Sequence, residues 1–307
     1  MSGSVRNSAI SWIAVDWGTT HLRAWAMDAA GEVLAEASSA DGMGALTRDG
    51  FEPALVRLID GWLSDGVRLP VIACGMVGSR QGWVEAPYRA VPCRAEAGAP
   101  VTVETRDSRL SVHVIPGVMQ PEPPDVMRGE ETQIAGFLAA NEGWDGVVCL
   151  PGTHTKWAHL SAGEIVSFQT FMTGDLFAAI AGHTVLRHSV TTDSWDTEAF
   201  EEAVADAISR PEKLAARLFG LRAAGLLHGR DGASATAALS GYLIGAELAA
   251  ARPYWLGQQV AVIGASKVAA HYAAALANQG VSANILSAQE AVLRGLAAHL
   301  DQVKATT

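Results

Sequence analysis

Cysteine is scarce in this sequence, which limits the chemistry on which the fold can depend. Only Cys74, Cys93 and Cys149 occur, and no two of them form a C-x-x-C pair. Three cysteines cannot all be paired within one chain, whereas secreted domains stabilised by disulfides are usually rich in paired cysteines. The sequence therefore favours a reducing compartment, and we expect a cytoplasmic protein.

Long apolar runs and positive charge are also lacking. No stretch approaches the ~18 apolar residues that cross a bilayer, and residues 1–8 contain no apolar core of a signal peptide. Lys and Arg number 22 against 32 Asp and Glu, which gives a formal net charge of −10, and no basic run occurs. Nucleic acids and anionic membranes bind basic patches. We therefore expect a protein that neither spans a membrane nor binds nucleic acid.

Two familiar chemical motifs are missing as well. The sequence has no G-x-x-x-x-G-K-[ST] segment, and its nearest approach, at residues 264–267, is too short to be a P-loop. The histidines include no H-E-x-x-H motif and no clustered partners, so packed or solvated histidines are a better interpretation than a zinc site. A phosphate site in this chain must therefore use other loops.

What is present is a chain of 307 residues, of which 49% are hydrophobic and 18% charged. Such a chain forms a substantial core, and its length favours two domains of roughly 150 residues each. The proline-rich stretch at residues 116–124 has the composition of a linker or hinge. We therefore predict an N-terminal domain at residues 1–128 and a C-terminal domain at residues 129–307.

The order of predicted elements repeats along the chain. In the first half, short strands at 11–15, 21–28 and 33–38 are joined by tight turns, and a helix at 51–63 precedes a buried strand at 71–74. The second half has strands at 147–150, 156–160 and 165–171, helices at 177–183 and 237–251, and then a strand, helix, strand and helix at 260–263, 268–278, 281–286 and 288–300. The repetition predicts a duplicated α/β domain with a cleft between the copies.

The turn after the first strand is rich in residues that bind phosphate. Gly18 allows a ligand to approach the backbone closely, and Thr19 and Thr20 offer hydroxyl and amide donors. Asp16, at the end of the strand, is placed to hold Mg²⁺, which favours one or two carboxylates together with phosphates. Considered alone, the turn is better interpreted as an ordinary hairpin with an Asx turn.

A second loop occupies the corresponding turn of the second half. It runs from Leu150 to Trp157 and contains Gly152, Thr153, His154, Thr155 and Lys156. Two such loops on opposite sides of a cleft would bind a polyphosphate from both sides. The equivalent placement of the two loops makes a phosphate site the preferred interpretation.

These loops resemble those of a known superfamily. Residues 16–23 resemble the first phosphate motif of the sugar kinase, Hsp70 and actin superfamily, and Gly152-Thr153 resembles its second. Gly264, Ala265 and Ser266 are similar to its adenosine motif, with Ala265 where a glycine is common. Other segments look like the 2-dehydro-3-deoxygalactonokinase family, in the same order and across nearly the whole chain: residues 73–79, 82–83, 86–88, 126–133, 151–157, 172–174, 239–241 and 244–247.

The resemblance implies an α/β protein of duplicated ribonuclease H-like domains, the actin-like ATPase fold, with an interdomain cleft. It also implies transfer of the ATP γ-phosphoryl group to the 6-hydroxyl of 2-dehydro-3-deoxy-D-galactonate, a step of galactonate catabolism. ATP and Mg²⁺ are the implied cofactors, and a small sugar acid is the implied partner. The sequence leaves a homodimer open. The alternatives are a kinase of another sugar or sugar acid and a non-metabolic ATP-clamp regulator.

An acidic pair at the start of the second domain supplies the candidate base. In related carbohydrate kinases an acidic residue there deprotonates the acceptor hydroxyl, and Glu130 matches that position better than Glu131. The alternative is that both glutamates only stabilise the first turn of a helix. Asp175, at the start of another helix, is a rival base, although an N-terminal helix role suits it better.

The substrate that the resemblance implies is an anion with several hydroxyls. A guanidinium binds a carboxylate with two parallel hydrogen bonds, which makes Arg128 a candidate. Ser79, Trp83 and Tyr88 are candidates for the remaining contacts. For Trp83 and Tyr88, packing in the core or at its rim is an equally good interpretation.

Overall fold

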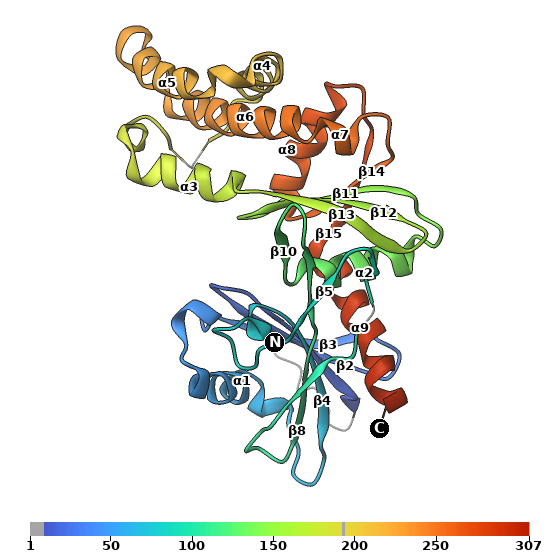
Figure 1. The fold of residues 1–307 in the computed structure, drawn as a ribbon. Helices are drawn as coiled ribbons and strands as arrows, with labels where there is room; N and C mark the ends of the chain where they lie inside the picture. The colour runs from blue at the N-terminus through green and yellow to red at the C-terminus, as the bar shows by residue number, and fades with distance from the viewer. Residues whose placement is uncertain (1–8, 97, 192–193, 307) are drawn as a thin grey trace. The chain divides into compact units, whose positions relative to one another are not determined.

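The computed structural model describes residues 9–96, 98–191 and 194–306. Residues 1–8, in which we found no signal peptide, lie outside this part of the chain. Contacts between residues divide the chain into two compact units (Figure 1). Unit 1 comprises residues 1–144, 161–167 and 288–307, and unit 2 comprises residues 145–160 and 168–287. This division differs from the predicted boundary between residues 128 and 129.

The main sheet of unit 1 has the strand order β3-β2-β1-β4-β8-β7. Its strands are β1 (Trp12–Trp17), β2 (Leu22–Met27), β3 (Val33–Ser39), β4 (Leu69–Gly75), β7 (Val101–Val103) and β8 (Leu110–Val114). The first three strands are antiparallel neighbours, whereas β4 lies parallel to both β1 and β8. The predicted opening meander and the strand that follows it are therefore confirmed.

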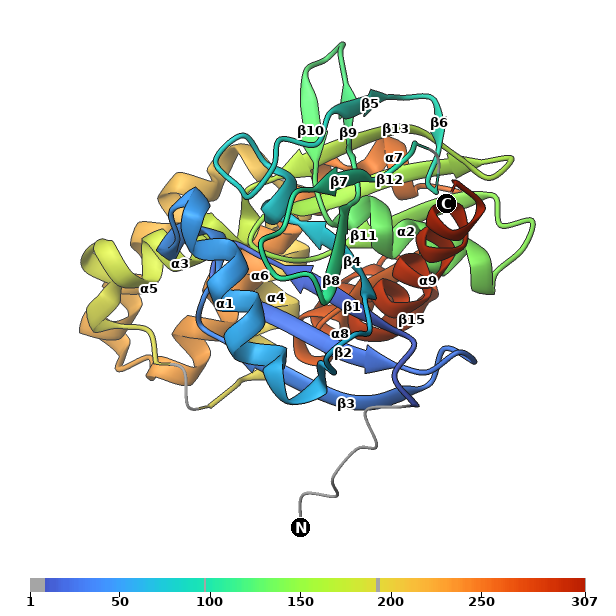
Figure 2. The ribbon, with the colours of Figure 1, turned by 90° about the horizontal axis from the view of Figure 1, so that it is seen from below.

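Alternation along β1 gives this sheet two buried faces. Ile13 and Val15 share a core cluster with α1 (Phe51–Ile59), whereas Trp12 and Ala14 share another with α9 (Ala288–Thr306). Successive side chains of a strand point to opposite faces, so α1 and α9 cover opposite sides of the sheet (Figure 2). The last helix of the chain is thus part of the first unit.

Close packing of α2 (Glu130–Ala140) against α9 explains why both helices belong to unit 1. A Cβ atom built on Gly136 would lie 1.8 Å from the carbonyl oxygen of Ala291, and one built on Gly295 would lie 1.9 Å from that of Thr132. Only glycine allows two helix backbones to approach so closely.

The proline-rich segment is not a linker, so that prediction is wrong. It contains β9 (Gly117–Gln120), which pairs antiparallel with β10 (Asp125–Met127) and parallel with β5 (Tyr88–Ala90) in a small sheet. The prolines cluster in the turn between β9 and β10, where no ladder hydrogen bond is required of them.

The main sheet of unit 2 repeats the strand order of unit 1. Its order is β15-β14-β11-β12-β13, and the short strand β6 (Cys93–Arg94), which pairs with β13 at Glu164 and Ile165, belongs with residues 161–167 to unit 1. The strands are β11 (Gly146–Leu150), β12 (Thr155–Ser161), β13 (Glu164–Phe171), β14 (Val260–Gly264) and β15 (Ala283–Ser287). As in unit 1, the central strand has an antiparallel neighbour on one side and two successive parallel strands on the other.

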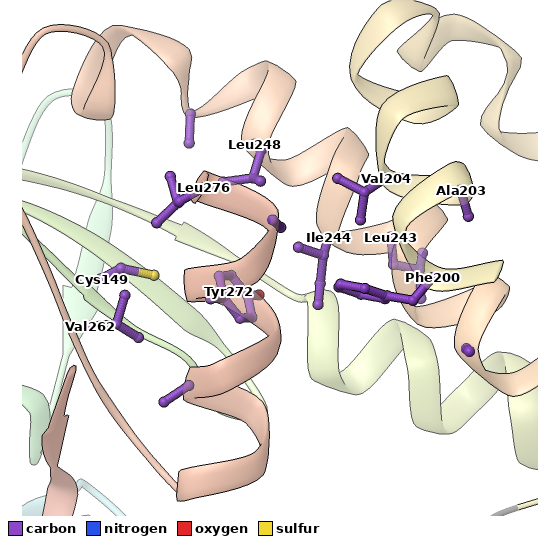
Figure 3. Close-up of a cluster of buried hydrophobic side chains, with 14 of the residues drawn as sticks. Cys149, Phe200, Ala203, Val204, Leu243, Ile244, Leu248, Val262, Tyr272 and Leu276 are labelled. Carbon is purple, nitrogen blue, oxygen red and sulfur yellow. The ribbon is translucent and has the colours of Figure 1, made fainter. Parts of the chain in front are cut away.

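Helices cover the sheet of unit 2 and supply most of its core. They are α3 (Thr173–His183), α4 (Thr197–Ser209), α5 (Leu214–His228), α6 (Gly232–Ala250), α7 (Arg252–Trp255) and α8 (Ser266–Ala277). Figure 3 shows Phe200 and Val204 of α4 beside Leu243 and Ile244 of α6. In the part of the chain that the structure describes, no helix has the length and apolarity needed to cross a membrane.

Short 3-10 helices complete the described chain. They are η2 (Met43–Ala45), η3 (Arg48–Gly50), η4 (Asp60–Trp62), η5 (Met76–Gly78), η6 (Val185–His188) and η7 (Pro211–Lys213). Of these, η5 directly follows β4.

Candidate active site

Asp16 lies at the carboxyl end of β1, beside the end of β4. Its Oδ2 accepts a hydrogen bond from Arg23 Nη2 at 2.5 Å, and its Oδ1 lies 3.9 Å from the Cys74 thiol. Burial raises the pKa of the Asp16 carboxyl, the Arg23 guanidinium opposes that rise, and the negative charge of Glu130 adds to it. The fold therefore brings Asp16 and Glu130 close enough to interact electrostatically, although they are far apart in sequence.

Two glycines make this approach possible. Gly75 at the end of β4 has φ +91°, and a Cβ atom there would lie 2.7 Å from the carbonyl oxygen of Trp17. Gly129 has φ +111°, and its Cβ would lie 3.4 Å from the Cα of Gly75. Residues with side chains rarely adopt such φ values. The start of α2 thus lies directly against the ends of β1 and β4.

The two adjacent glutamates have different environments. Glu131 is fully buried, and both of its carboxyl oxygens accept the Gly129 N–H, at 2.7 and 2.9 Å. Burial, and after it the charge of Glu130, raises the pKa of Glu131 to about 7. Glu130 is only half-buried and accepts the Arg128 N–H at 3.1 Å. Glu131 therefore fixes the turn, whereas Glu130 keeps an accessible carboxyl beside Asp16.

Arg128 has the features of an anion-binding residue. It is 9% exposed, its Nη2 donates to the Ala86 carbonyl at 2.8 Å, and its guanidinium lies 4.3 Å from the centre of the Tyr88 ring. In the described chain, its Nε and Nη1 are buried without a hydrogen-bond partner, as is the Oγ of Ser79. A Cβ on Gly78 would lie 2.8 Å from Nη1. Buried donors normally have partners, so these groups are available for a ligand.

Trp83 has a structural role. It is buried in a core cluster, where its ring centre lies 6.1 Å from that of Trp17 and 6.3 Å from that of Phe51. The packing interpretation therefore accounts for Trp83 without a substrate contact. Tyr88, in contrast, is 38% exposed and carries Arg128 on its ring.

The first glycine–threonine loop is held by the backbone of the segment that follows β3. Met43 N–H donates to the Gly18 carbonyl at 3.0 Å, and Gly44 N–H donates to the Thr19 carbonyl at 2.9 Å. The side chains of Thr19 and Thr20 are exposed. These contacts fix the loop and leave the threonine hydroxyls open to a ligand.

In unit 2, the second glycine–threonine loop packs against the start of α3. A Cβ on Gly174 would lie 2.4 Å from the Gly152 carbonyl oxygen, and Asp175 N–H donates to the Thr153 carbonyl at 3.0 Å. The Asp175 carboxylate also lies 3.1 Å from Nε2 of His154. Asp175 therefore supports the loop from the helix terminus. This contact was not predicted from the sequence, in which the Thr-Gly-Asp segment is the only local signal for it.

The remaining predicted residues of unit 2 divide between exposed and buried positions. Gly152, Thr153 and His154 are partly or fully exposed, whereas Thr155 and Lys156 are buried at the start of β12. The segment at Gly264, Ala265 and Ser266 joins β14 to α8, and a Cβ on Gly264 would lie 3.4 Å from Pro151. Since β14 is parallel to β11, both segments lie at one edge of the sheet.

A buried carboxyl behind this edge was not found from the sequence. Glu247 of α6 accepts hydrogen bonds from Trp157 Nε1 at 2.8 Å, from the Tyr272 hydroxyl at 2.8 Å and from the Thr173 hydroxyl. The Thr155 hydroxyl lies 3.0 Å from that of Tyr272. Burial raises the pKa of Glu247 to about 7, against the effect of these hydrogen bonds. Figure 3 shows Tyr272 on α8, beside the sheet residues Cys149 and Val262.

This carboxyl makes stability dependent on pH. Between its ordinary pKa of 4.5 and about 7, the folded chain keeps a proton on Glu247 that the unfolded chain has lost. The free energy of unfolding therefore falls as pH rises through this range, by about 3 kcal/mol from this group. Urea unfolding at pH 5, 6 and 7 measures how the free energy of unfolding falls with pH. We expect that fall to be smaller in Glu247→Gln by the contribution of this group. An unchanged pH dependence in the variant would contradict the assignment.

The described residues contain no group of three or more His, Cys, Asp and Glu side chains that could hold a metal ion. A site in which Asp16 holds Mg²⁺ together with nucleotide phosphates needs no such group, because Mg²⁺ retains several waters. The partly buried Asp16 carboxylate, with Glu130 nearby, fits that kind of site.

Comparisons with known proteins agree on one family. The family described as 2-keto-3-deoxy-galactonokinase matches residues 16–299. A Rhizobium meliloti (strain 1021) protein named "Probable 2-dehydro-3-deoxygalactonokinase DgoK1" is 40% identical, over 94% of this chain and 95% of its own. The 2-dehydro-3-deoxygalactonokinase of Escherichia coli (strain K12) is 31% identical, over 93% of this chain and 96% of its own.

Solved structures are similar as well. The crystal structure of a Sinorhizobium meliloti protein described as "a putative 2-dehydro-3-deoxygalactonokinase protein" has a TM-score of 0.87 at 39% identity, over 95% of this chain and 96% of its own. Component A of the (R)-2-hydroxyglutaryl-CoA dehydratase of Acidaminococcus fermentans has a TM-score of 0.54 at 14% identity, over 96% of this chain and 99% of its own. The second likeness concerns the fold alone.

Proposed function

Since the chain belongs to the 2-keto-3-deoxy-galactonokinase family, we propose that it phosphorylates the 6-hydroxyl of 2-dehydro-3-deoxy-D-galactonate with ATP, a step of galactonate catabolism. The enzyme is a phosphotransferase with an alcohol group as acceptor. The observation that carries the assignment to this chain's residues is the convergence of Asp16, Arg128 and Glu130 at the ends of β1 and β4 and the start of α2.

Glu130 is the proposed base. Its carboxylate accepts the proton of the 6-hydroxyl as that oxygen bonds to the γ-phosphorus, and the bond from phosphorus to the ADP oxygen breaks. Glu131 is the less suitable base, because both of its oxygens are directed to the Gly129 N–H in a buried site. We assign Glu131 to holding Glu130 in place.

The nucleotide phosphates are the proposed ligands of both glycine–threonine loops. Gly18, Thr19 and Thr20 would bind them from unit 1, and Gly152, Thr153 and His154 from unit 2, with Gly264, Ala265 and Ser266 toward the adenosine. The buried Thr155 and Lys156 would support the second loop. Asp16 would hold Mg²⁺, which neutralises phosphate charge when bound.

The sugar acid is the proposed ligand of Arg128. Its carboxylate would accept a hydrogen bond from the unpartnered Nη1, and Ser79 Oγ would bind a neighbouring oxygen. Tyr88 would hold the guanidinium in place from its ring face.

Replacing Arg128 with lysine tests this site. We expect the KM for the sugar acid to rise by about 10²-fold, because lysine keeps the charge but loses the planar guanidinium that lies on the Tyr88 ring. The KM for ATP should change little in steady-state assays that vary one substrate at a time. Arg89→Lys is the matched control, because Arg89 contacts only the carbonyls of Arg94 and Ala95 among the hydrogen bonds described. An unchanged KM for the acid would overturn the assignment.

The experiment that tests the function as a whole is an acceptor screen. ADP release is measured with several 2-keto-3-deoxy acids and with plain hexoses, and the position of the phosphate in the product is determined. The proposal expects release that depends on the acid and a 6-phosphate product. Preference for a hexose would favour another sugar kinase, and ATP hydrolysis independent of any acceptor would favour an ATP-clamp regulator.

The finer features of the architecture belong to the same proposal. The shared strand order of the two main sheets supports duplicated ribonuclease H-like domains of the actin-like ATPase fold, which would close as a cleft around the substrates. The three cysteines, all free, support a cytoplasmic location. The domains at residues 1–128 and 129–307 stay predictions. A homodimer also stays a prediction, and light scattering would test it by measuring the molar mass in solution.

A further inference from the structure

Glu247 connects the elements that surround the second glycine–threonine loop. Its carboxyl, on α6, binds one side chain from β12, one from α3 and one from α8. Each donor is near the loop or the neighbouring adenosine segment. Trp157 follows the loop on β12, Thr173 precedes Gly174, which touches Gly152, and α8 begins at Ser266. One carboxyl thus links three elements at the same edge of the sheet.

The ionised carboxylate also fixes the direction of the hydrogen bonds. A carboxylate only accepts, so Trp157, Thr173 and Tyr272 must all donate to it. The tyrosine has a single hydroxyl proton, which leaves its oxygen to accept from Thr155. Thr155 directly follows the loop and is fully buried. The network therefore links the C-terminal end of the loop, at Thr155 and Trp157, to Thr173 at the start of α3.

We propose that Glu247 is a positioning residue for ATP, holding the Gly152-Thr153 loop against the start of α3 in the form that binds the nucleotide phosphates. The inference rests on the proposed function, because it takes ATP as the ligand of this loop. Glu247 is buried and its hydrogen bonds are to protein groups, so it acts through Thr173, Trp157 and Tyr272.

Glu247→Gln tests the inference at pH 8, where the carboxyl is ionised. Glutamine has the same size, but its NH₂ group would replace the oxygen that accepts from Thr173 and Tyr272, so both hydroxyls must reverse their hydrogen bonds or lose them. We expect the KM for ATP to rise at least tenfold, with no change in the KM for the sugar acid. Tyr272→Phe, which removes one donor and keeps the ring, should raise the KM for ATP by a smaller factor.

Thr236→Val is the matched control on the same helix. Thr236 is also buried, and its hydroxyl accepts from the Thr191 N–H and shares its one proton between the carbonyls of Thr191 and Gly232, all remote in sequence from the loop. Its replacement should lower the melting temperature and leave the KM for ATP unchanged. Equal changes in KM for the two α6 variants, or a wild-type KM in Glu247→Gln, would overturn the inference.

Two further measurements separate this inference from the proposed function. If Glu247→Gln does not fold, Tyr272→Phe becomes the test of the inference. An unchanged KM for ATP in Tyr272→Phe then overturns it. Calorimetry with a non-hydrolysable ATP analogue measures nucleotide affinity without an acceptor. A wild-type protein that binds the analogue but phosphorylates no sugar acid contradicts only the function, and a tenfold loss of analogue affinity in Glu247→Gln still supports the positioning role.

Discussion

Glu130→Gln is expected to lower kcat by about 10²- to 10⁴-fold, the usual contribution of a positioned general base. Glutamine keeps the size of the side chain and its acceptor for the Arg128 N–H. It cannot take the proton of the attacking hydroxyl. Steady-state kinetics give the loss of turnover, and calorimetry with an ATP analogue should show an affinity close to that of the wild type.

Glu131→Gln is the control that the structure offers for this result. It changes the neighbouring carboxyl, which is buried on Gly129 and is not assigned to the chemistry. We expect a smaller loss of turnover and a larger change in stability than for Glu130→Gln. The opposite ranking would make Glu131 the base, and full activity in Glu130→Gln would rule out its proposed role.

Asp16→Asn is expected to lower kcat by about 10²-fold and to raise the Mg²⁺ concentration at half-maximal rate. The amide is neutral and binds Mg²⁺ weakly, since hard cations prefer charged oxygen ligands. It also loses the ion pair with Arg23, which leaves that guanidinium without its carboxylate. The measurement is the initial rate as a function of Mg²⁺ concentration at saturating ATP and sugar acid.

Asp60→Asn provides the comparison for Asp16→Asn. Asp60 is an exposed carboxylate of the same unit, and its ion pair is with Arg109, away from the site. Its replacement should leave both kcat and the Mg²⁺ requirement unchanged. Should Asp16→Asn behave in the same way, the metal-binding role proposed for Asp16 would be wrong.

Local patterns were sufficient to predict most of the elements. A short apolar run located β1, helical periodicity located α1, and the predicted helix at 268–278 matches α8 within a few residues. Both loops could be predicted because glycine and threonine directly follow a buried strand, and the loop must begin where that strand ends. The composition of residues 116–124 misled, because prolines in a hairpin turn and prolines in a linker give the same pattern.

Contacts between distant segments could not be predicted in this way. Nothing local to Glu247 indicates that its carboxyl faces Trp157, Thr173 and Tyr272. The difference between the adjacent Glu130 and Glu131 is likewise tertiary, because it depends on which carboxyl is buried against Gly129. The resemblance to carbohydrate kinases identified the pair and favoured Glu130, but it could not show that Glu131 is the buried carboxyl.

The packing of α9 on the first sheet bears on how the chain folds as it is synthesised. Trp12 and Trp25 leave the ribosome long before Val292 and Leu296, with which they share a core. At 5–20 residues per second, that side of the sheet waits on the order of tens of seconds for its covering helix. The second unit, continuous in sequence apart from residues 161–167, is complete before the first. Synthesis of the first unit therefore begins before that of the second, but its core is the last to be completed.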